Sequence, residues 1–164
     1  MSQPAFTVYS FLDLSLALVD PDVGSYSPTA GELGFGQLTI EMITERISHR
    51  VAADGLVMIG YKPGSNANVD IMVQQTSPLN SWLLNWANTK FGNADNGNVF
   101  TLAGMQFTAR NILDGTQHVC MGVTPTKIPP KSYAAEPGDI TWRLMAANAT
   151  QINVSAPFSV ALGV

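Results

Sequence analysis

His118 and Cys120, the chain's single cysteine, lie two residues apart and form the first candidate for chemistry. On a β-strand such a pair shares one face, so it could supply a base and a nucleophile or two metal ligands. The only other histidine is His49 and there is no second cysteine, so a full ligand set would need carboxylates. A small buried thiol beside a hydrogen-bonded histidine is the favoured interpretation. We therefore predict no catalytic residue, no cofactor and no metal site.

Two carboxylates four residues apart, Glu41 and Glu45, form the second candidate. With Gln37 and Thr39 they would make one polar, acidic side of a strand. Paired carboxylates can hydrolyse glycosidic bonds, but that chemistry needs a cleft with aromatic side chains, and the aromatic residues here are scattered. This side is therefore interpreted either as the solvated face of a half-buried sheet or as the lining of a channel formed by several subunits.

Signatures of common enzymes and nucleotide-binding sites are missing from the sequence. It contains no GxSxG, HExxH, GxxxxGK[ST] or GxGxxG pattern. Trp82 and Trp86 lie one helical turn apart and share a face with Leu79 and Leu83, which favours core packing over a sugar-binding platform. We predict that the protein is not an enzyme.

Alternation of apolar and polar residues dominates the chain and predicts β-strands. The expected strands cover about 6–20, 37–52, 56–61, 69–75, 99–103, 105–112, 116–124 and 139–154. In 37–52 the apolar residues also recur at helical spacing, but the many β-branched residues favour a strand. Asp54 and Gly55 tolerate positive φ and predict a tight hairpin turn.

One α-helix is expected from residue 78 to about residue 91. Ser77 or Thr76 can cap its start, and Pro78 suits its first position. Lys90 would lie in the last turn, with Gly92 just beyond the end. About eight strands and one helix predict a mainly β fold, an antiparallel β-barrel or sandwich with one flanking α-helix, in a single domain over residues 1–164.

Residues 20–36 interrupt the alternation with four glycines and two prolines. A structureless segment of this length is uncommon inside a compact domain and often serves an interaction. We predict an extended arm here that contacts other subunits. Its candidate contact residues are Asp22, Tyr26, Glu32 and Phe35.

Charge is scarce and unevenly distributed. Charged residues make up 12% of the chain, against about 25% in typical soluble domains. Residues 1–45 contain six acidic residues and no basic one, while the remainder has a balance of +2. Burial of the surface against copies of the same chain would explain the low charge. The acidic balance disfavours tight nucleic-acid binding, and the sequence predicts no secretory signal and no membrane span.

Four segments, taken in order, resemble the tail-tube proteins of contractile-tailed bacteriophages. They are GQLTIE at 36–41, ADGLVM at 53–58, QTSPLN at 75–80 and DITWRL at 139–144. The chain departs from the family in its Gly/Pro-rich segment at 20–36 and in a Pro-rich stretch at 125–137.

The resemblance implies a virion structural protein without catalytic residues. Such proteins form homohexameric rings whose sheets join into a β-barrel, and the rings stack into a tube that DNA and the tape-measure protein traverse during ejection. The implied partners are further copies, tail sheath and baseplate proteins, with assembly in the host cytoplasm and a final place in the virion tail. DNA would transit without specific binding, and the candidate lumen-facing residues are Gln37, Thr39, Glu41 and Glu45. A discrete baseplate, tube-initiator or adaptor ring and a β-sandwich binding module are the alternatives.

Overall fold

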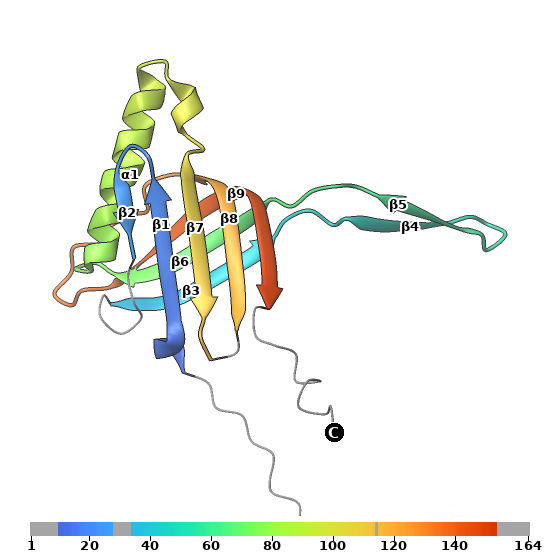
Figure 1. Ribbon diagram of the computed structural model, residues 1–164, viewed down its shortest axis with the longest axis horizontal. Helices are drawn as coiled ribbons and strands as arrows, with labels where there is room; N and C mark the ends of the chain where they lie inside the picture. The colour runs from blue at the N-terminus through green and yellow to red at the C-terminus, as the bar shows by residue number, and fades with distance from the viewer. Residues whose placement is uncertain (1–9, 28–33, 114, 154–164) are drawn as a thin grey trace, which may run out of the picture.

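A computed structural model of the chain describes residues 10–27, 34–113 and 115–153. Within these residues it contains nine strands, one α-helix and two 3-10 helices (Figure 1). In chain order they are η1 (Phe11–Asp13), β1 (Leu14–Asp20), β2 (Gly24–Tyr26), β3 (Phe35–Met42), β4 (Ile47–Val51), β5 (Val57–Tyr61), β6 (Ala67–Gln74), α1 (Pro78–Asp95), η2 (Val99–Thr101), β7 (Met105–Asn111), β8 (Thr116–Pro125) and β9 (Asp139–Asn153). The prediction of a mainly β fold with one helix is confirmed.

Seven strands form one antiparallel sheet in the order β2-β1-β7-β8-β9-β6-β3. The sheet curls into a half-barrel, so that β3 and β6 cross behind β1, β7 and β8 (Figure 1). The 15-residue strand β9 links the two halves, because its first part pairs with β6 and its second part pairs with β8. The two halves thereby enclose a common apolar interior.

The core lies between these halves, with α1 closing one end. Alternate residues point inward, as the period of two predicts. Fully buried examples are Leu18, Val69, Ile71, Val73, Phe107, Trp142 and Leu144 from the strands, and Leu79, Leu83 and Trp86 from α1. The indole nitrogen of Trp142 donates a 2.8 Å hydrogen bond to Asn80 Oδ1, which joins β9 to the first turn of α1.

Helix α1 begins as predicted and ends later. Ser77 Oγ accepts a hydrogen bond from Leu79 N–H, and Pro78 occupies the first position. The helix continues past Gly92, since the residue that ends it is Gly97, at a left-handed φ of +92°. Lys90 therefore lies inside the helix and not in its last turn. The strand expected at 99–103 is instead η2.

The described part of residues 20–36 is packed against the sheet, so the prediction of an extended arm is corrected there. The chain turns after Asp20, and β2 pairs back onto β1. The Tyr26 ring stacks on Trp82 with centroids 5.8 Å apart. Phe35 begins β3 and is only 7% exposed, in the core. Pairing to β1 and the two aromatic contacts hold this segment down.

Candidate functional site

The extended feature of this molecule is the β4–β5 hairpin, which projects from the half-barrel (Figure 1). Within the described residues, β4 and β5 pair with one another and with no strand of the seven-stranded sheet. Asp54 Oδ1 accepts a hydrogen bond from Leu56 N–H, and Gly55 has a φ of +92°. The hairpin turn predicted at Asp54 and Gly55 is therefore confirmed, whereas the projection was not expected.

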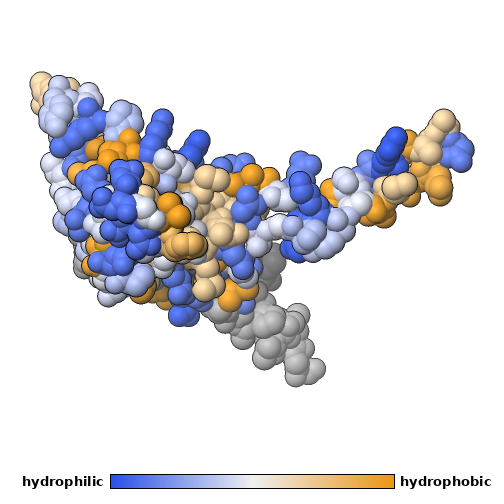
Figure 2. All heavy atoms as spheres, turned by 90° about the horizontal axis from the view of Figure 1, so that it is seen from above, coloured by the Kyte–Doolittle hydropathy of each residue, from blue (hydrophilic) through white to orange (hydrophobic). Residues whose placement is uncertain are grey.

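One side of this hairpin is apolar. Cross-strand pairing places six residues on it, which we call the apolar hairpin face: Ile47, His49, Val51, Val57, Ile59 and Tyr61. The four aliphatic side chains and Tyr61 are between 46% and 65% exposed. Figure 2 shows hydrophobic residues along the arm and at its tip. Ser48, Arg50, Met58 and Gly60 lie on the opposite side.

An exposed apolar face on a projecting hairpin needs a partner surface. Isolated two-stranded hairpins are marginally stable in water, and contiguous exposed apolar patches mark interaction sites. Burial contributes about 25 cal/mol for each Å² of apolar surface removed from water. The apolar hairpin face is thus suited to protein–protein contact.

A polar surface forms on the outer face of β3. Gln37, Thr39 and Glu41 are all exposed there and alternate with half-buried residues. In the sheet Thr39 lies opposite Asp70, which lies opposite Arg143. The structure thus brings together three of the four candidate lumen-facing residues. Glu45 lies beyond the end of β3, in the segment before β4.

Electrostatics on this face are dominated by one exposed ion pair. Arg143 Nε lies 3.0 Å from Asp70 Oδ1, and a second hydrogen bond joins Nη2 to Oδ2. The bond to Asp70 raises the pKa of the Arg143 guanidinium, with a smaller contribution from the charge of Glu41. Two carboxylates against one guanidinium leave this part of the sheet negatively charged.

His118 and Cys120 do not assemble a reactive centre in the described residues. Cys120 is fully buried in the core, and burial raises the pKa of its thiol to about 11. A thiol held neutral at physiological pH is a poor nucleophile and a poor metal ligand. Among the residues that the structure places, no cluster of three His, Cys, Asp or Glu side chains is arranged to hold a metal ion. The prediction of a buried thiol is confirmed.

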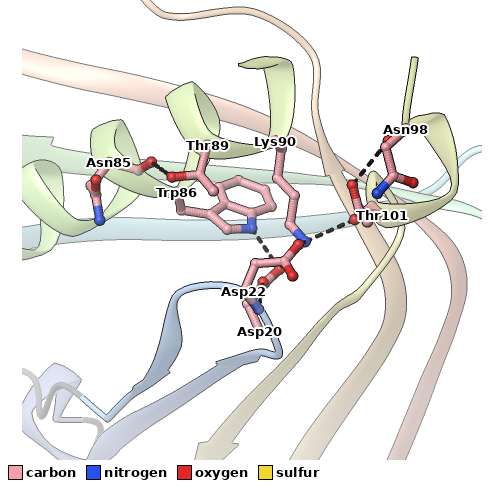
Figure 3. A network of polar contacts seen from close by, with 8 residues as sticks. All are labelled: Asp20, Asp22, Asn85, Trp86, Thr89, Lys90, Asn98 and Thr101. Atoms are coloured by element: carbon pink, nitrogen blue, oxygen red, sulfur yellow. Dashed lines mark hydrogen bonds and ion pairs between the residues drawn. The ribbon is translucent and has the colours of Figure 1, made fainter. Parts of the chain in front are cut away.

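A buried polar cluster links the turn after β1 to α1 and η2 (Figure 3). The Nζ atom of Lys90 lies 2.9 Å from Asp20 Oδ2 and 2.8 Å from Asp22 Oδ2, and donates to the Thr101 carbonyl at 2.8 Å. Trp86 Nε1 donates to Asp20 at 3.0 Å. Asp22, expected in an intersubunit arm, thus binds within its own subunit.

This Lys90 cluster was missed at the sequence level. A lysine near the expected end of a helix is most simply interpreted as a solvent-exposed side chain that interacts favourably with the helix dipole. The available signal was the acidic segment before residue 46, which has no basic residue of its own. Glu32, the remaining arm candidate, lies outside the described residues.

Comparison with known proteins identifies the family. A profile described as "Bacteriophage PhiTE tail tube protein" matches residues 6–154. The chain belongs to this tail tube family. As a tail tube protein it is a structural, non-enzymatic component of a virion or of a related contractile particle. No curated protein matches the chain, and no helix in the described residues is long and apolar enough to cross a membrane.

Solved structures with the same fold come from contractile injection systems. The PVC sheath/tube terminator is 13% identical, with a TM-score of 0.60 over 93% of this tail tube protein and 99% of that chain. The tube-terminating cap of the anti-feeding prophage is 10% identical, with a TM-score of 0.58 over 94% and 97%. A chain of the PVC sheath-tube complex is 11% identical, with a TM-score of 0.54 over 90% and 93%. At these identities the similarity shows a shared fold.

Proposed function

We propose that six copies of this tail tube protein form a ring and that rings stack into a hollow conduit for DNA during ejection. The tube would be assembled in the host cytoplasm, become part of the virion tail, and contact tail sheath, baseplate and tape-measure proteins. The observation that carries this proposal is the projecting β4–β5 hairpin in a chain of the tail tube family. Among the described residues this apolar arm pairs with no strand of the main sheet, so it is well suited to contact a neighbouring subunit.

The surface composition supports extensive self-contact. Ring and stacking contacts would remove much of each subunit's surface from water, which fits a charged fraction of only 12%. The hairpin's apolar side chains, separated from the core of their own subunit, would be buried in the same contacts. Among the candidate arm residues of 20–36, we propose contact with other subunits only for those whose side chains are exposed on the subunit.

The outer face of β3 supports a lumen assignment for Gln37, Thr39 and Glu41. A conduit for DNA works best when its wall does not hold phosphate groups. Glu41 and Asp70 make the wall acidic, while the ion pair with Asp70 engages Arg143. A short-range repulsion between this wall and DNA would let the duplex slide.

Electron microscopy of the purified full chain tests the proposal. In negative stain across a concentration series, we expect rings and hollow tubes of uniform diameter, with native mass spectrometry giving six copies for each ring. A sample that remains monomeric at every concentration would argue against a self-assembling tube subunit. Rings that never stack would favour the second candidate, a discrete terminator, initiator or adaptor ring, since two of the similar structures are a cap and a terminator.

A charge reversal tests the lumen assignment. Glu41→Lys should leave tube formation intact, because a lumen residue makes no contact between subunits. Under the proposal the change replaces the carboxylate of every copy in the ring by an ammonium group, which shifts the net charge of a six-membered ring by about +12, so the tubes should retain short DNA at low salt and release it at high salt. The measurement is co-sedimentation of labelled DNA with tubes, followed by nuclease treatment.

The nuclease step separates the lumen from other locations of Glu41. DNA held inside the tube should be protected from digestion. DNA that binds and is digested would place Glu41 on the outside, and loss of the tubes would place it in a contact between subunits. Glu136→Lys on the exposed Pro-rich loop carries the same charge change and should give no protected DNA.

A further inference from the structure

Phe100 is the most exposed large apolar side chain of the described residues, at 93%. It lies in η2, which follows α1, and its neighbour Val99 is 53% exposed. No residue of η2 is buried. An aromatic ring contributes strongly to binding when a partner removes it from water. These two side chains, which we call the η2 anchor, are therefore a candidate contact surface.

The η2 anchor is held in place by its own subunit. The Thr101 carbonyl accepts the 2.8 Å hydrogen bond from Lys90, and Thr101 Oγ1 donates to the Asn98 carbonyl at 3.1 Å (Figure 3). The Leu102 N–H donates to the Val99 carbonyl at 3.2 Å, which closes the 3-10 turn. A side chain on a fixed backbone loses less conformational entropy on binding than one on a flexible loop. The Lys90 cluster thus helps to present the anchor in one position.

The charged groups beside the η2 anchor are acidic. Residues 96–109 contain no charged residue, so burial of η2 would remove no charge of its own from water. Asp95 is exposed directly before this stretch, in the last turn of α1, which has no basic residue. Asp22 lies at the same end of the molecule, because Lys90 binds both Asp22 and the Thr101 carbonyl. That ammonium also neutralises Asp20, so a basic partner surface would complement this end.

The β4–β5 hairpin has the matching chemistry. Residues 45–62 contain three basic and two acidic residues, a balance of +1. Arg46 and Lys62 are exposed at the base of the hairpin, where the Lys62 N–H donates to the Arg46 carbonyl at 2.8 Å. Glu45 is adjacent to this pair, and Asp54 lies at the tip. Between base and tip lies the apolar hairpin face, so this surface is apolar at its centre and basic at its base.

We propose that the η2 anchor of one copy binds the apolar hairpin face of a second copy. The hairpin projects from the side of the half-barrel away from α1 and η2, so the contact joins different copies (Figure 1). Contact between two different surfaces is head-to-tail association, which closes into a ring or continues as a stack, depending on the rotation between copies. The inference rests on the proposed function and adds the surface that receives the hairpin.

A tail sheath protein is the competing partner of the η2 anchor. A second copy is favoured because both surfaces are apolar and the charges beside them are opposite. Asp95 and Asp22 lie beside the anchor, and Arg46 and Lys62 lie at the base of the hairpin. Such a contact would bury the Phe100 ring at its centre and keep the charged groups at its rim, as stable protein interfaces do.

Photo-cross-linking from residue 100 tests this contact in the full chain. Isotopically labelled chain with p-benzoylphenylalanine in place of Phe100 is mixed with an excess of unlabelled wild type before assembly. In rings or tubes we expect products of twice the chain mass that join position 100 to unlabelled peptides from residues 47–61. Cross-links elsewhere, or none, from intact rings or tubes would overturn this inference and leave the proposed function standing. If the wild type forms no rings or tubes, both fail.

Removal of the ring provides the second measurement. Phe100→Ser should leave the Tm of the dispersed subunit unchanged, because the ring is exposed, and should raise the protein concentration needed for assembly roughly tenfold or more. Tyr133→Ser removes a ring that is 88% exposed on the Pro-rich loop and should assemble like the wild type. Equal assembly of the two variants would overturn the inference. A lowered Tm for Phe100→Ser would also overturn it, since the ring would then stabilise its own subunit.

Discussion

Replacement of Ile59 by aspartate should abolish ring and tube formation while the subunit stays folded. Ile59 lies at the centre of the apolar hairpin face, is 65% exposed in the subunit, and has His49 directly opposite. Under the proposed function that side chain is buried between copies, so the variant would bury an unpaired carboxylate in an apolar contact. If each contact between copies loses about two to three kcal/mol of binding free energy, assembly requires a roughly 30- to 150-fold higher protein concentration. Repetition around a ring multiplies this penalty.

The adjacent residue gives a matched control. Met58 is 68% exposed on the other side of the same strand. Met58→Asp adds the same charge at the same distance along the arm and should assemble far better than Ile59→Asp. Light scattering and negative-stain images measure assembly, and a thermal melt of the dispersed subunit measures folding. Normal tubes from Ile59→Asp would contradict a role of the apolar hairpin face in assembly.

Local sequence patterns predicted most strands because a period of two is imposed directly by the pleat of a sheet. The ambiguous segment 37–52 is extended, as predicted, but it is not one strand: β3 ends at Met42 and β4 begins at Ile47, in a different sheet. The pattern fails where β7 and β8 change register, with one extra residue on β8 at Gly122, whose φ is +64°. Before this bulge the buried residue is the even-numbered Cys120, and beyond it the buried residue is the odd-numbered Val123. A rule based on strict alternation therefore assigns the residues after the bulge to the wrong face.

Longer-range features were not available from local patterns. Glycines and prolines in 20–36 indicate turns equally well in a packed segment and in an arm. Tertiary contacts determine that the segment is packed: Tyr26 stacks on Trp82, and Phe35 is buried in the core. The hairpin turn at Gly55 was predicted, but its projection depends on which strands join the main sheet. The lumen assignment of Gln37, Thr39 and Glu41 stays a prediction, although their common exposed face was correctly inferred.

Replacement of Lys90 by alanine should destabilise the subunit by about 3–5 kcal/mol. The Lys90 ammonium is fully buried and holds Asp20 and Asp22 at 2.9 and 2.8 Å. Without it, the Asp20 carboxylate stays in the interior at 1% exposure, with the Trp86 indole and a backbone N–H as donors but no cation. Urea unfolding of the dispersed subunit should show a midpoint lower by ~2 M with an unchanged slope, because urea m values are about 1–3 kcal/mol/M.

A double variant separates loss of charge pairing from loss of packing. In Asp20→Asn/Lys90→Met the buried carboxylate becomes neutral and the long side chain is retained, so most of the lost stability should return. Lys127→Ala, at an exposed position on the loop after β8, should unfold like the wild type. If Lys90→Ala and the double variant were equally unstable, neither the charge of Asp20 nor the lost side-chain length would explain the effect, and the bonds of the Lys90 ammonium to Asp22 and the Thr101 carbonyl would be its main contribution. The expected recovery would instead show that Lys90 neutralises buried charge. Asp20 and Asp22 come from a segment that has no basic residue of its own, and the Lys90 ammonium lets them pack against α1.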